Sequence, residues 1–284
     1  MNTINEEIRV KTYNNRDAGR QAANVVGALF QIGATIIASA KIQEVVDEGP
    51  PSLVEPAGYA FAIWLLIFTL SLAYAIYQAL PANRENPLLR RVGWFTAGAF
   101  ACTGLWSVFV PERQLLLALA MLLVVFTCLA VVYLRFARDD ARQGRRPGRS
   151  ERWLAALPVG IFLGWITAAI TVSINSELIR FGVVSAGGAG EVLLGTALLL
   201  LGGALAAAVV MVGRSGPVQG YLAYGGTVLW ALVAVVVNQY DASILTTSAA
   251  VVAAVPVTLA LFGRLPGSRP RPGEGHAVQH NVAT

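Results

Sequence analysis

Residues 114–134 read QLLLALAMLLVVFTCLAVVYL, and no Asp, Glu, Lys or Arg interrupts them. An α-helix needs about 20 apolar residues to cross a hydrocarbon core roughly 30 Å thick, so this stretch is long enough to span a membrane. Similar uncharged runs cover 22–40, 58–80, 92–110, 153–174, 192–212, 218–237 and 242–262. The sequence therefore predicts an all-α, polytopic transmembrane bundle of eight helices.

Basic residues occupy alternate connections between these runs. Seven arginines, from Arg135 to Arg152, directly follow the run that ends at residue 134. With the N-terminal segment, the connections after residues 80 and 212, and the C-terminal tail, this side holds 18 of the 21 basic residues. Short basic connections stay in the cytoplasm. We therefore expect a multi-pass protein of the cell (cytoplasmic) membrane with both termini in the cytoplasm.

The composition is that of a membrane protein, since 56% of the residues are hydrophobic and 13% are charged. The net charge of +5 comes from the basic connections, which orient the helices in the membrane. We therefore expect the lipid bilayer as a partner and no nucleic acid. Cys102 and Cys128 lie inside apolar runs and are expected to be reduced thiols. The polar cytoplasmic segment 1–21 is expected to be loose, and the Pro- and Gly-rich tail 264–284 to be disordered.

The apolar runs lack the ionisable side chains on which much membrane chemistry depends. Lys11 and Lys41 are the only lysines, and His276 and His280, the only histidines, lie in the tail. A retinal Schiff base needs a buried lysine, and haem or metal ligation needs a histidine in the bundle. The runs also lack a carboxylate for a proton relay or a sodium site. We expect no metal, no tightly bound cofactor and no ion-coupled transport.

Three of the runs carry a tryptophan on one helical face, with further aromatic or polar residues near it. Such stripes suit a pocket for a flat, largely apolar ligand that is held by ring stacking. Tryptophan is also common at membrane interfaces, where Trp94 and Trp153 are expected. For the three deeper tryptophans, ligand contact and plain bundle packing both remain open. The stripes are Phe61, Trp64 and Phe68 in 58–80, Trp106 and Ser107 in 92–110, and Phe162 and Trp165 in 153–174.

Over residues 22–180 these segments resemble the tryptophan-rich sensory protein family, also called TspO/MBR, translocator protein or peripheral benzodiazepine receptor. That family is a five-helix bundle with a proline-rich first loop and an aromatic start to its second helix. The resemblance rests on Pro50, Pro51 and Pro56 in the loop, Tyr59, Phe61, Trp64 and Phe68 in the second run, Trp106 and Ser107 in the third, and Pro158 and Trp165 in the fifth.

The chain also departs from the family pattern. Thr103 and Ser173 stand where the family has asparagines, and one residue is missing between Phe61 and Trp64. Three further helices, in 181–263, extend the five-helix unit, and the Gly-rich patch 185–190 separates the two parts. We expect this extension to pack against the five-helix unit or to form an interface in a homo-oligomer.

The resemblance implies a membrane receptor or binding protein for a hydrophobic planar ligand, either a porphyrin or haem precursor or a sterol-like lipid. It implies a role in tetrapyrrole transport or stress-linked regulation, with the loop 41–56 as a lid. Arg113 and Arg180 are candidates to pair with tetrapyrrole propionates. The expected ligand-binding residues are Tyr59, Phe61, Trp64, Phe68, Trp106, Ser107, Phe162 and Trp165.

Two other functions remain open from the sequence, besides a purely structural role that would fit the extension. The first is a facilitative carrier that uses all eight helices to move a lipophilic solute without ion coupling. The second is an enzyme, because the resemblance also implies possible light-dependent degradation of porphyrin. The uncharged runs favour a binding protein or a carrier over an enzyme.

Overall fold

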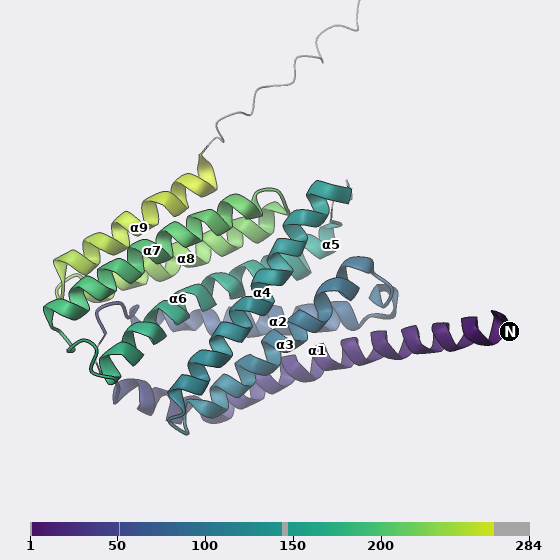
Figure 1. Ribbon diagram of the computed structural model, residues 1–284, viewed down its shortest axis with the longest axis horizontal. Helices are drawn as coiled ribbons and strands as arrows, with labels where there is room; N and C mark the ends of the chain where they lie inside the picture. Colours follow the sequence, from purple (N-terminus) through teal and green to yellow (C-terminus); the bar gives the residue numbers. More distant parts are fainter. Residues whose placement is uncertain (1, 51, 144–146, 264–284) are drawn as a thin grey trace, which may run out of the picture.

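The computed structural model describes residues 2–50, 52–143 and 147–263, which form a bundle of long helices that alternate in direction along the chain (Figure 1). Within these residues eight helices are long and apolar enough to cross a membrane, which confirms the predicted fold class. The long helices are α1 (Asn2–Asp47), α2 (Ile63–Ala79), α3 (Pro87–Phe109), α4 (Leu115–Gln143), α6 (Leu157–Arg180), α7 (Ala189–Gly213), α8 (Val218–Gln239) and α9 (Ile244–Phe262). The short elements are the 3-10 turns η1 (Gly58–Ala62) and η2 (Pro81–Asn83), the single turn α5 (Arg149–Glu151) and the π turn η3 (Arg152–Ala156).

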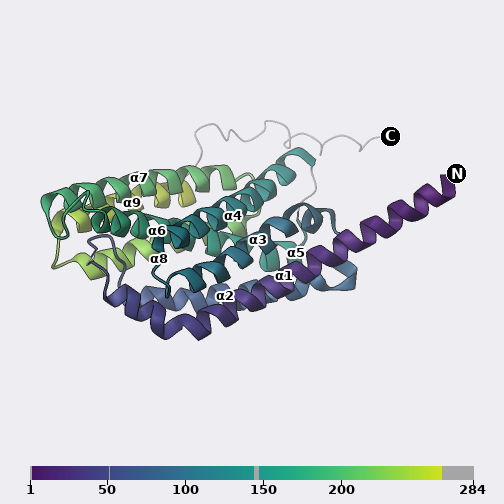
Figure 2. The same ribbon diagram turned by 60° about the horizontal axis from the view of Figure 1, so that its bottom comes forward.

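The helices pack in a continuous series rather than as two separate bundles. Helix α1 lies along α3 and α2, α3 lies along α4, and α4 packs on α6. Helix α6 then contacts both α7 and α8, and α9 packs against these two helices (Figures 1 and 2). Helix α6 therefore joins the first five spans to the last three, so the extension packs against the five-helix unit.

Small residues set the distance between the helices of the extension. A Cβ atom built on Gly203 of α7 would lie 2.7 Å from the Cβ of Ala253 in α9. The same test on Gly164 of α6 places a Cβ 2.7 Å from the backbone oxygen of Tyr224 in α8. These helices approach so closely because glycine leaves room for the neighbouring backbone, as the small residues of the run 192–212 indicate.

The expectation that residues 1–21 are loose is wrong for residues 2–21, because α1 begins at Asn2 and continues through this segment. No proline occurs in this segment and its first glycine is Gly19, so nothing interrupts the hydrogen-bond ladder of the helix. The expected disorder of the tail 264–284 lies outside the described residues.

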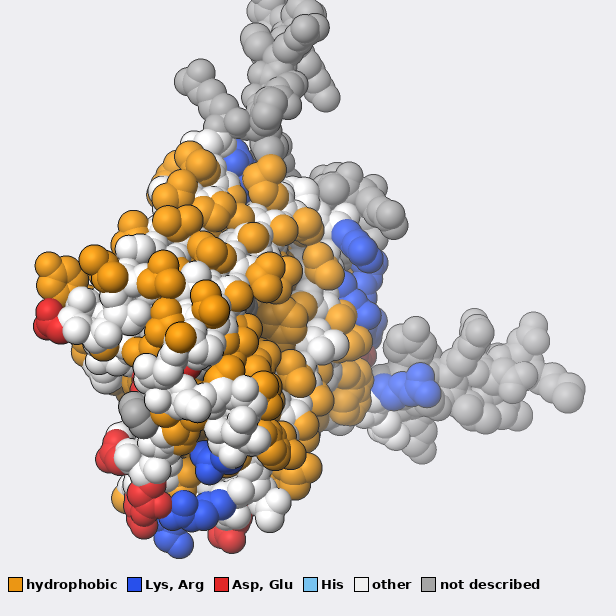
Figure 3. Space-filling view, turned by 60° about the vertical axis from the view of Figure 1, so that its left-hand side comes forward, with side chains coloured by type: hydrophobic (Ala, Val, Ile, Leu, Met, Phe, Trp, Pro, Cys, Tyr) orange, Lys and Arg blue, Asp and Glu red, His pale blue; other side chains and the backbone are white. Residues whose placement is uncertain are grey.

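The basic connections lie at one end of the bundle. The start of α1, the α2–α3, α4–α6 and α7–α8 connections, and the end of α9 lie at the right-hand ends of their helices in Figure 1, opposite the α3–α4, α6–α7 and α8–α9 connections. Hydrophobic side chains cover the face between the two ends, while charged groups gather toward the ends (Figure 3). The protein is therefore a multi-pass membrane protein. That both termini lie on the cytoplasmic side stays a prediction.

A π turn precedes the part of α6 that carries the predicted aromatic residues. Pro158 lacks a backbone N–H and cannot donate to the preceding turn, and η3 ends two residues before it, at Ala156. From Leu157 the helix is regular, so Phe162 and Trp165 lie on its buried face.

Candidate functional site

Trp64 is the centre of a cluster of five aromatic rings from α2, α3 and α6. Its ring stacks on Trp106, with ring centroids 6.0 Å apart and an interplanar angle of 20°. It meets Trp165 edge-to-face at 6.3 Å and Phe162 at 6.1 Å, and it lies 5.3 Å from Phe68. Each such pair adds about 0.5–1.5 kcal/mol to the burial of the rings. The structure thus brings together the three tryptophans that the sequence singled out.

The other two predicted aromatic residues lie at the margin of this aromatic cluster. Phe61 contacts Trp165 edge-to-face, with ring centroids 5.5 Å apart, and is 40% exposed. Tyr59 is 45% exposed and packs on Trp230 of α8 at 5.3 Å. The indole of Trp230 also donates to the backbone oxygen of Ala60, at 3.4 Å. Helix α8, part of the extension, therefore supplies an aromatic ring beside the aromatic cluster. The five-helix resemblance did not assign this ring.

Ser107, predicted as a ligand-binding residue, joins α3 to α1. Its hydroxyl oxygen lies 2.6 Å from that of Thr35, and the side chain is fully buried. It also donates to the carbonyl of Thr103, 3.3 Å away. A role of Ser107 in ligand binding stays a prediction, since its hydroxyl already has two protein contacts.

A polar chain crosses the core nearer to the basic end of the bundle. The side-chain amide of Asn24, in α1, donates to the backbone carbonyl of Gly93 at 2.7 Å. The Thr96 hydroxyl donates to the side-chain oxygen of Asn24 at 2.6 Å. The hydroxyls of Thr96 and Tyr74 lie 3.0 Å apart, which extends the chain to α2. All three side chains are buried. Their amide and hydroxyl groups are satisfied within the protein, as interior polar groups require.

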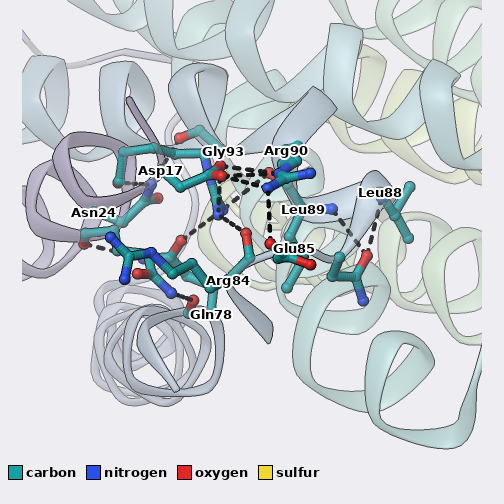
Figure 4. Close-up of polar contacts among 12 residues, drawn as sticks. Asp17, Asn24, Gln78, Arg84, Glu85, Leu88, Leu89, Arg90 and Gly93 are labelled. Carbon is teal, nitrogen blue, oxygen red and sulfur yellow. Dashed lines mark hydrogen bonds and ion pairs between the residues drawn. The ribbon is translucent and has the colours of Figure 1, made fainter. Parts of the chain in front are cut away.

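Arg20 binds α1 to the start of α3 and to the end of α2, and its side chain is 1% exposed. Figure 4 shows the residues around it, among them Gln78, Arg84 and Leu89. One terminal nitrogen donates to the Gln78 side chain at 3.1 Å and to the Leu89 carbonyl at 3.2 Å. The other donates to the carbonyl of Arg84 at 3.0 Å. This guanidinium therefore serves as a multiple hydrogen-bond donor at a helix junction.

Charged residues are buried near the ends of the spans, although the apolar runs contain none. Asp17 accepts from Arg90 at 2.6 Å and lies 3.5 Å from Arg20, within α1. Glu191, in the first turn of α7, is fully buried. Both carboxylates lie outside the uncharged runs, and hydrogen bonds from neighbouring groups compensate the burial of their charge.

Glu191 fixes the loop 48–57 to the extension. Its carboxylate accepts from the backbone N–H of Leu53 at 2.8 Å and from that of Gly187 at 2.6 Å. The Asn175 side chain donates to the same carboxylate at 3.3 Å and to the Ser52 hydroxyl at 2.9 Å. Gly187 adopts a φ of 68°, which suits glycine and turns its N–H toward Glu191.

Helix α8 holds the same loop from its other side. The Gln239 side chain donates to the carbonyls of Ser52 and Glu55, each at 3.1 Å, and Asn238 donates to Glu55 at 3.1 Å. The backbone N–H of Ala57 donates to the Ala234 carbonyl at 3.0 Å. The predicted lid covered 41–56, but residues 41–47 belong to α1. The part that follows the helix is attached to the extension, whose role here the sequence did not reveal.

A small cavity of about 40 Å³ lies between this loop, α6, α7 and α8. Among its described lining residues, only Thr167 and Thr171 have polar side chains. Gly202 and Gly203 of α7 form part of its wall. None of the predicted ligand-binding residues lines it, so this cavity is separate from the aromatic cluster.

The two arginines considered as partners for propionates are both paired with carboxylates. Arg113 donates to Glu48, a contact that raises the pKa of Arg113. Arg180 lies 3.6 Å from Glu177. Among the described residues, no group of three or more His, Cys, Asp or Glu side chains could hold a metal ion.

A family model described as TSPO-like protein matches residues 21–262. No curated protein and no solved structure matches the chain. The match starts just before the first predicted run and continues through α9, so it includes the three helices of the extension as well as the aromatic cluster. Since it covers well over half of the sequence, the chain belongs to the TSPO-like protein family.

Proposed function

We propose that this protein binds a hydrophobic planar ligand, a porphyrin or haem precursor or a sterol-like lipid, within the membrane. The observation that supports this most is the position of Trp64, whose ring contacts four other aromatic rings from three helices. Membership of a family of membrane binding and transport proteins supports the same conclusion. The proposed role is tetrapyrrole transport or stress-linked regulation.

The near-parallel rings of Trp64 and Trp106 offer a place for a flat molecule to insert. Their interplanar angle of 20° would let both rings stack on the two faces of one ligand. Trp165 and Phe162 would close the inner side, since both are 2% exposed. Phe61 and Tyr59, which are exposed, would lie where the ligand enters. Binding of this kind needs the two indoles to move apart.

The test is quenching of tryptophan fluorescence by protoporphyrin IX in the detergent-purified protein. Wild type is compared with the double variant Trp64→Phe, Trp165→Phe, in which indole rings of the cluster are replaced by smaller rings. Saturable quenching in wild type, with an apparent Kd raised about 10-fold or more in the variant, supports the proposal.

The matched control is the double variant Trp94→Phe, Trp153→Phe. These two tryptophans are 55% and 52% exposed and lie outside the cluster, so they should change the signal but not the apparent Kd. Quenching that is linear with porphyrin, or an apparent Kd that is equal in all three proteins, would mean partitioning into detergent and would contradict the proposal.

The cavity between α6, α7 and α8 favours a second candidate, a facilitative carrier of a lipophilic solute. It lies at the junction of the five-helix unit and the extension, where a solute path using all eight helices would run. A Cβ on Gly202 would meet nothing closer than 3.7 Å, so Gly202→Ala should narrow the cavity without moving α7. Solute flux into proteoliposomes that falls in this variant, while porphyrin affinity is retained, would favour the carrier.

We propose that both termini lie on the cytoplasmic side, on the evidence of the basic connections. A reporter enzyme that is active only outside the cytoplasm should therefore be inactive when fused after residue 263. The same reporter fused within 182–188, between α6 and α7, should be active. The reverse pattern would overturn this orientation.

A further inference from the structure

Gln31 differs from its polar neighbours on the inner face of α1. Asn24, two turns before it, and Thr35, one turn after it, are both hydrogen-bonded to α3. Gln31 is fully buried, yet neither its side-chain oxygen nor its side-chain nitrogen has a hydrogen-bond partner among the described residues. An interior amide therefore has one acceptor and two donors without protein partners.

Such an amide disfavours the folded protein when nothing binds to it. Burial removes it from water, and an unpaired donor or acceptor in an apolar interior is costly. Methionine has a similar length and would fill the same space without this penalty. Stability alone therefore does not account for glutamine here, whereas a bound group that pairs with the amide does.

The positions of its neighbours place Gln31 at the level of the aromatic cluster along α3. Thr35 contacts Ser107, the residue after Trp106, while Asn24 contacts Thr96 nearer to the basic end. Because α1 and α3 run parallel across these two contacts, Gln31 lies between them, closer to the Trp106 level. The indole N–H of Trp165, inside the cluster, is likewise buried and unpartnered in the described structure.

We propose that Gln31 is the polar anchor of the ligand site, and this rests on the proposed function of the aromatic cluster. The ligand class it selects is a flat hydrophobic molecule with a neutral group that both donates and accepts, such as a carboxamide or a lactam. The side-chain amide would form two parallel hydrogen bonds with that group. An ionised carboxylate is disfavoured, since the nearest buried cation on α1, Arg20, is engaged with Gln78 and backbone carbonyls.

The experiment compares two probes that differ by a single amide, anthracene and anthracene-9-carboxamide, through energy transfer from tryptophan. Wild type should bind the carboxamide about 10-fold more tightly than anthracene after correction for detergent partitioning. In Gln31→Met this preference should fall to roughly 2-fold or less, while anthracene affinity is unchanged. The apo form of Gln31→Met should also have a higher Tm than wild type.

Gln21→Met is the matched control, because Gln21 is a half-buried glutamine of the same helix whose amide donates to the Gln78 carbonyl at 2.7 Å. It should keep the preference for the carboxamide and lower the Tm. A Gln31→Met protein that keeps the full preference would overturn the role of Gln31 alone. Wild type that binds neither probe saturably would overturn the proposed function together with the anchor.

Discussion

Arg20 is a charged residue whose removal should destabilise the protein strongly. Arg20→Met leaves the Gln78 side chain and the carbonyls of Leu89 and Arg84 without this donor, in a site that is 1% exposed. We expect a loss of about 2–4 kcal/mol in the free energy of unfolding. Thermal denaturation in detergent measures it, with Arg16→Met, at an exposed position of α1, as the control. Equal Tm values for the two variants would contradict a structural role of the buried guanidinium.

The burial of Arg20 and Asp17 shows where a sequence-based expectation fails at the scale of a residue. Both lie before the first uncharged run, and hydropathy therefore placed them in a polar segment. The structure continues the helix through them, and α3 supplies Arg90 to Asp17 and the Leu89 carbonyl to Arg20. Those partners come from residues about 70 positions away, as the pairs 17–90 and 20–89 show, and local pattern carries no information on them.

Glu55 should make stability depend on pH. Burial, and secondarily the nearby charge of Asp47, raises the pKa of Glu55 above its ordinary value of 4.5. The folded protein then binds more protons than the unfolded chain, so its stability is full below that value and falls as the pH rises through the raised pKa. Glu55→Gln should remove this fall and gain a few °C in Tm near neutral pH.

The measurement for Glu55 is Tm against pH in detergent, from about pH 4 to about pH 7. Glu112→Gln, at an exposed position of the loop between α3 and α4, is the control and should keep the slope of wild type. If Glu55→Gln also keeps that slope, the carboxyl of Glu55 is not the group responsible.

At the scale of the helices, the sequence predicted how many there are but not how they pack. Each uncharged run became a span, because length and apolarity alone decide whether a helix fits the bilayer. Some ends moved outward, as in α6, which continues to Arg180 beyond the run 153–174, and others moved inward, as in α9, which begins at Ile244. Helix α6 lies between α4 and α8 because their apolar faces fit each other. A run that is apolar on all sides does not specify which of its faces meets which neighbour.

The contact of α6 with α8 should be sensitive to one methyl group. A Cβ on Gly164 would lie 2.7 Å from the Tyr224 backbone oxygen and 2.9 Å from the Cβ of Thr227, so Gly164→Ala must push the helices apart. We expect a loss of about 1–3 kcal/mol. Since Trp165 is the next residue, porphyrin affinity should fall as well.

Gly226→Ala is the control for this helix contact. A Cβ at Gly226 would meet no atom within 4 Å, and alanine is the better helix former by about 1 kcal/mol. The control should therefore be as stable as wild type or more stable in thermal denaturation. A Gly164→Ala protein that behaves in the same way would mean that α6 and α8 tolerate separation.

At the scale of the whole molecule, the candidate site was predictable only in its five-helix part. Helical spacing and the family resemblance together placed Trp64, Trp106 and Trp165 in one site, and the structure confirms that their rings meet. Trp230 and the attachment of the loop to α7 and α8 were not predictable, because the extension has no counterpart in the five-helix pattern. The extension thus takes part in closing the site that the first five spans build.

Glu191 should control how tightly the loop 48–57 is held over the outer end of the bundle. In Glu191→Gln one carboxylate oxygen becomes an NH₂ group, which cannot accept from both Leu53 and Gly187. Hydrogen bonds to a charged group contribute about 1.5–3 kcal/mol, so exchange of the Leu53 amide hydrogen should accelerate about 10- to 100-fold. Release of bound protoporphyrin IX should accelerate too if the loop acts as a lid, whereas Glu44→Gln, an exposed position at the same end, should alter neither rate. Faster exchange without faster release would mean that the loop is attached to the extension but does not cover the path of the ligand.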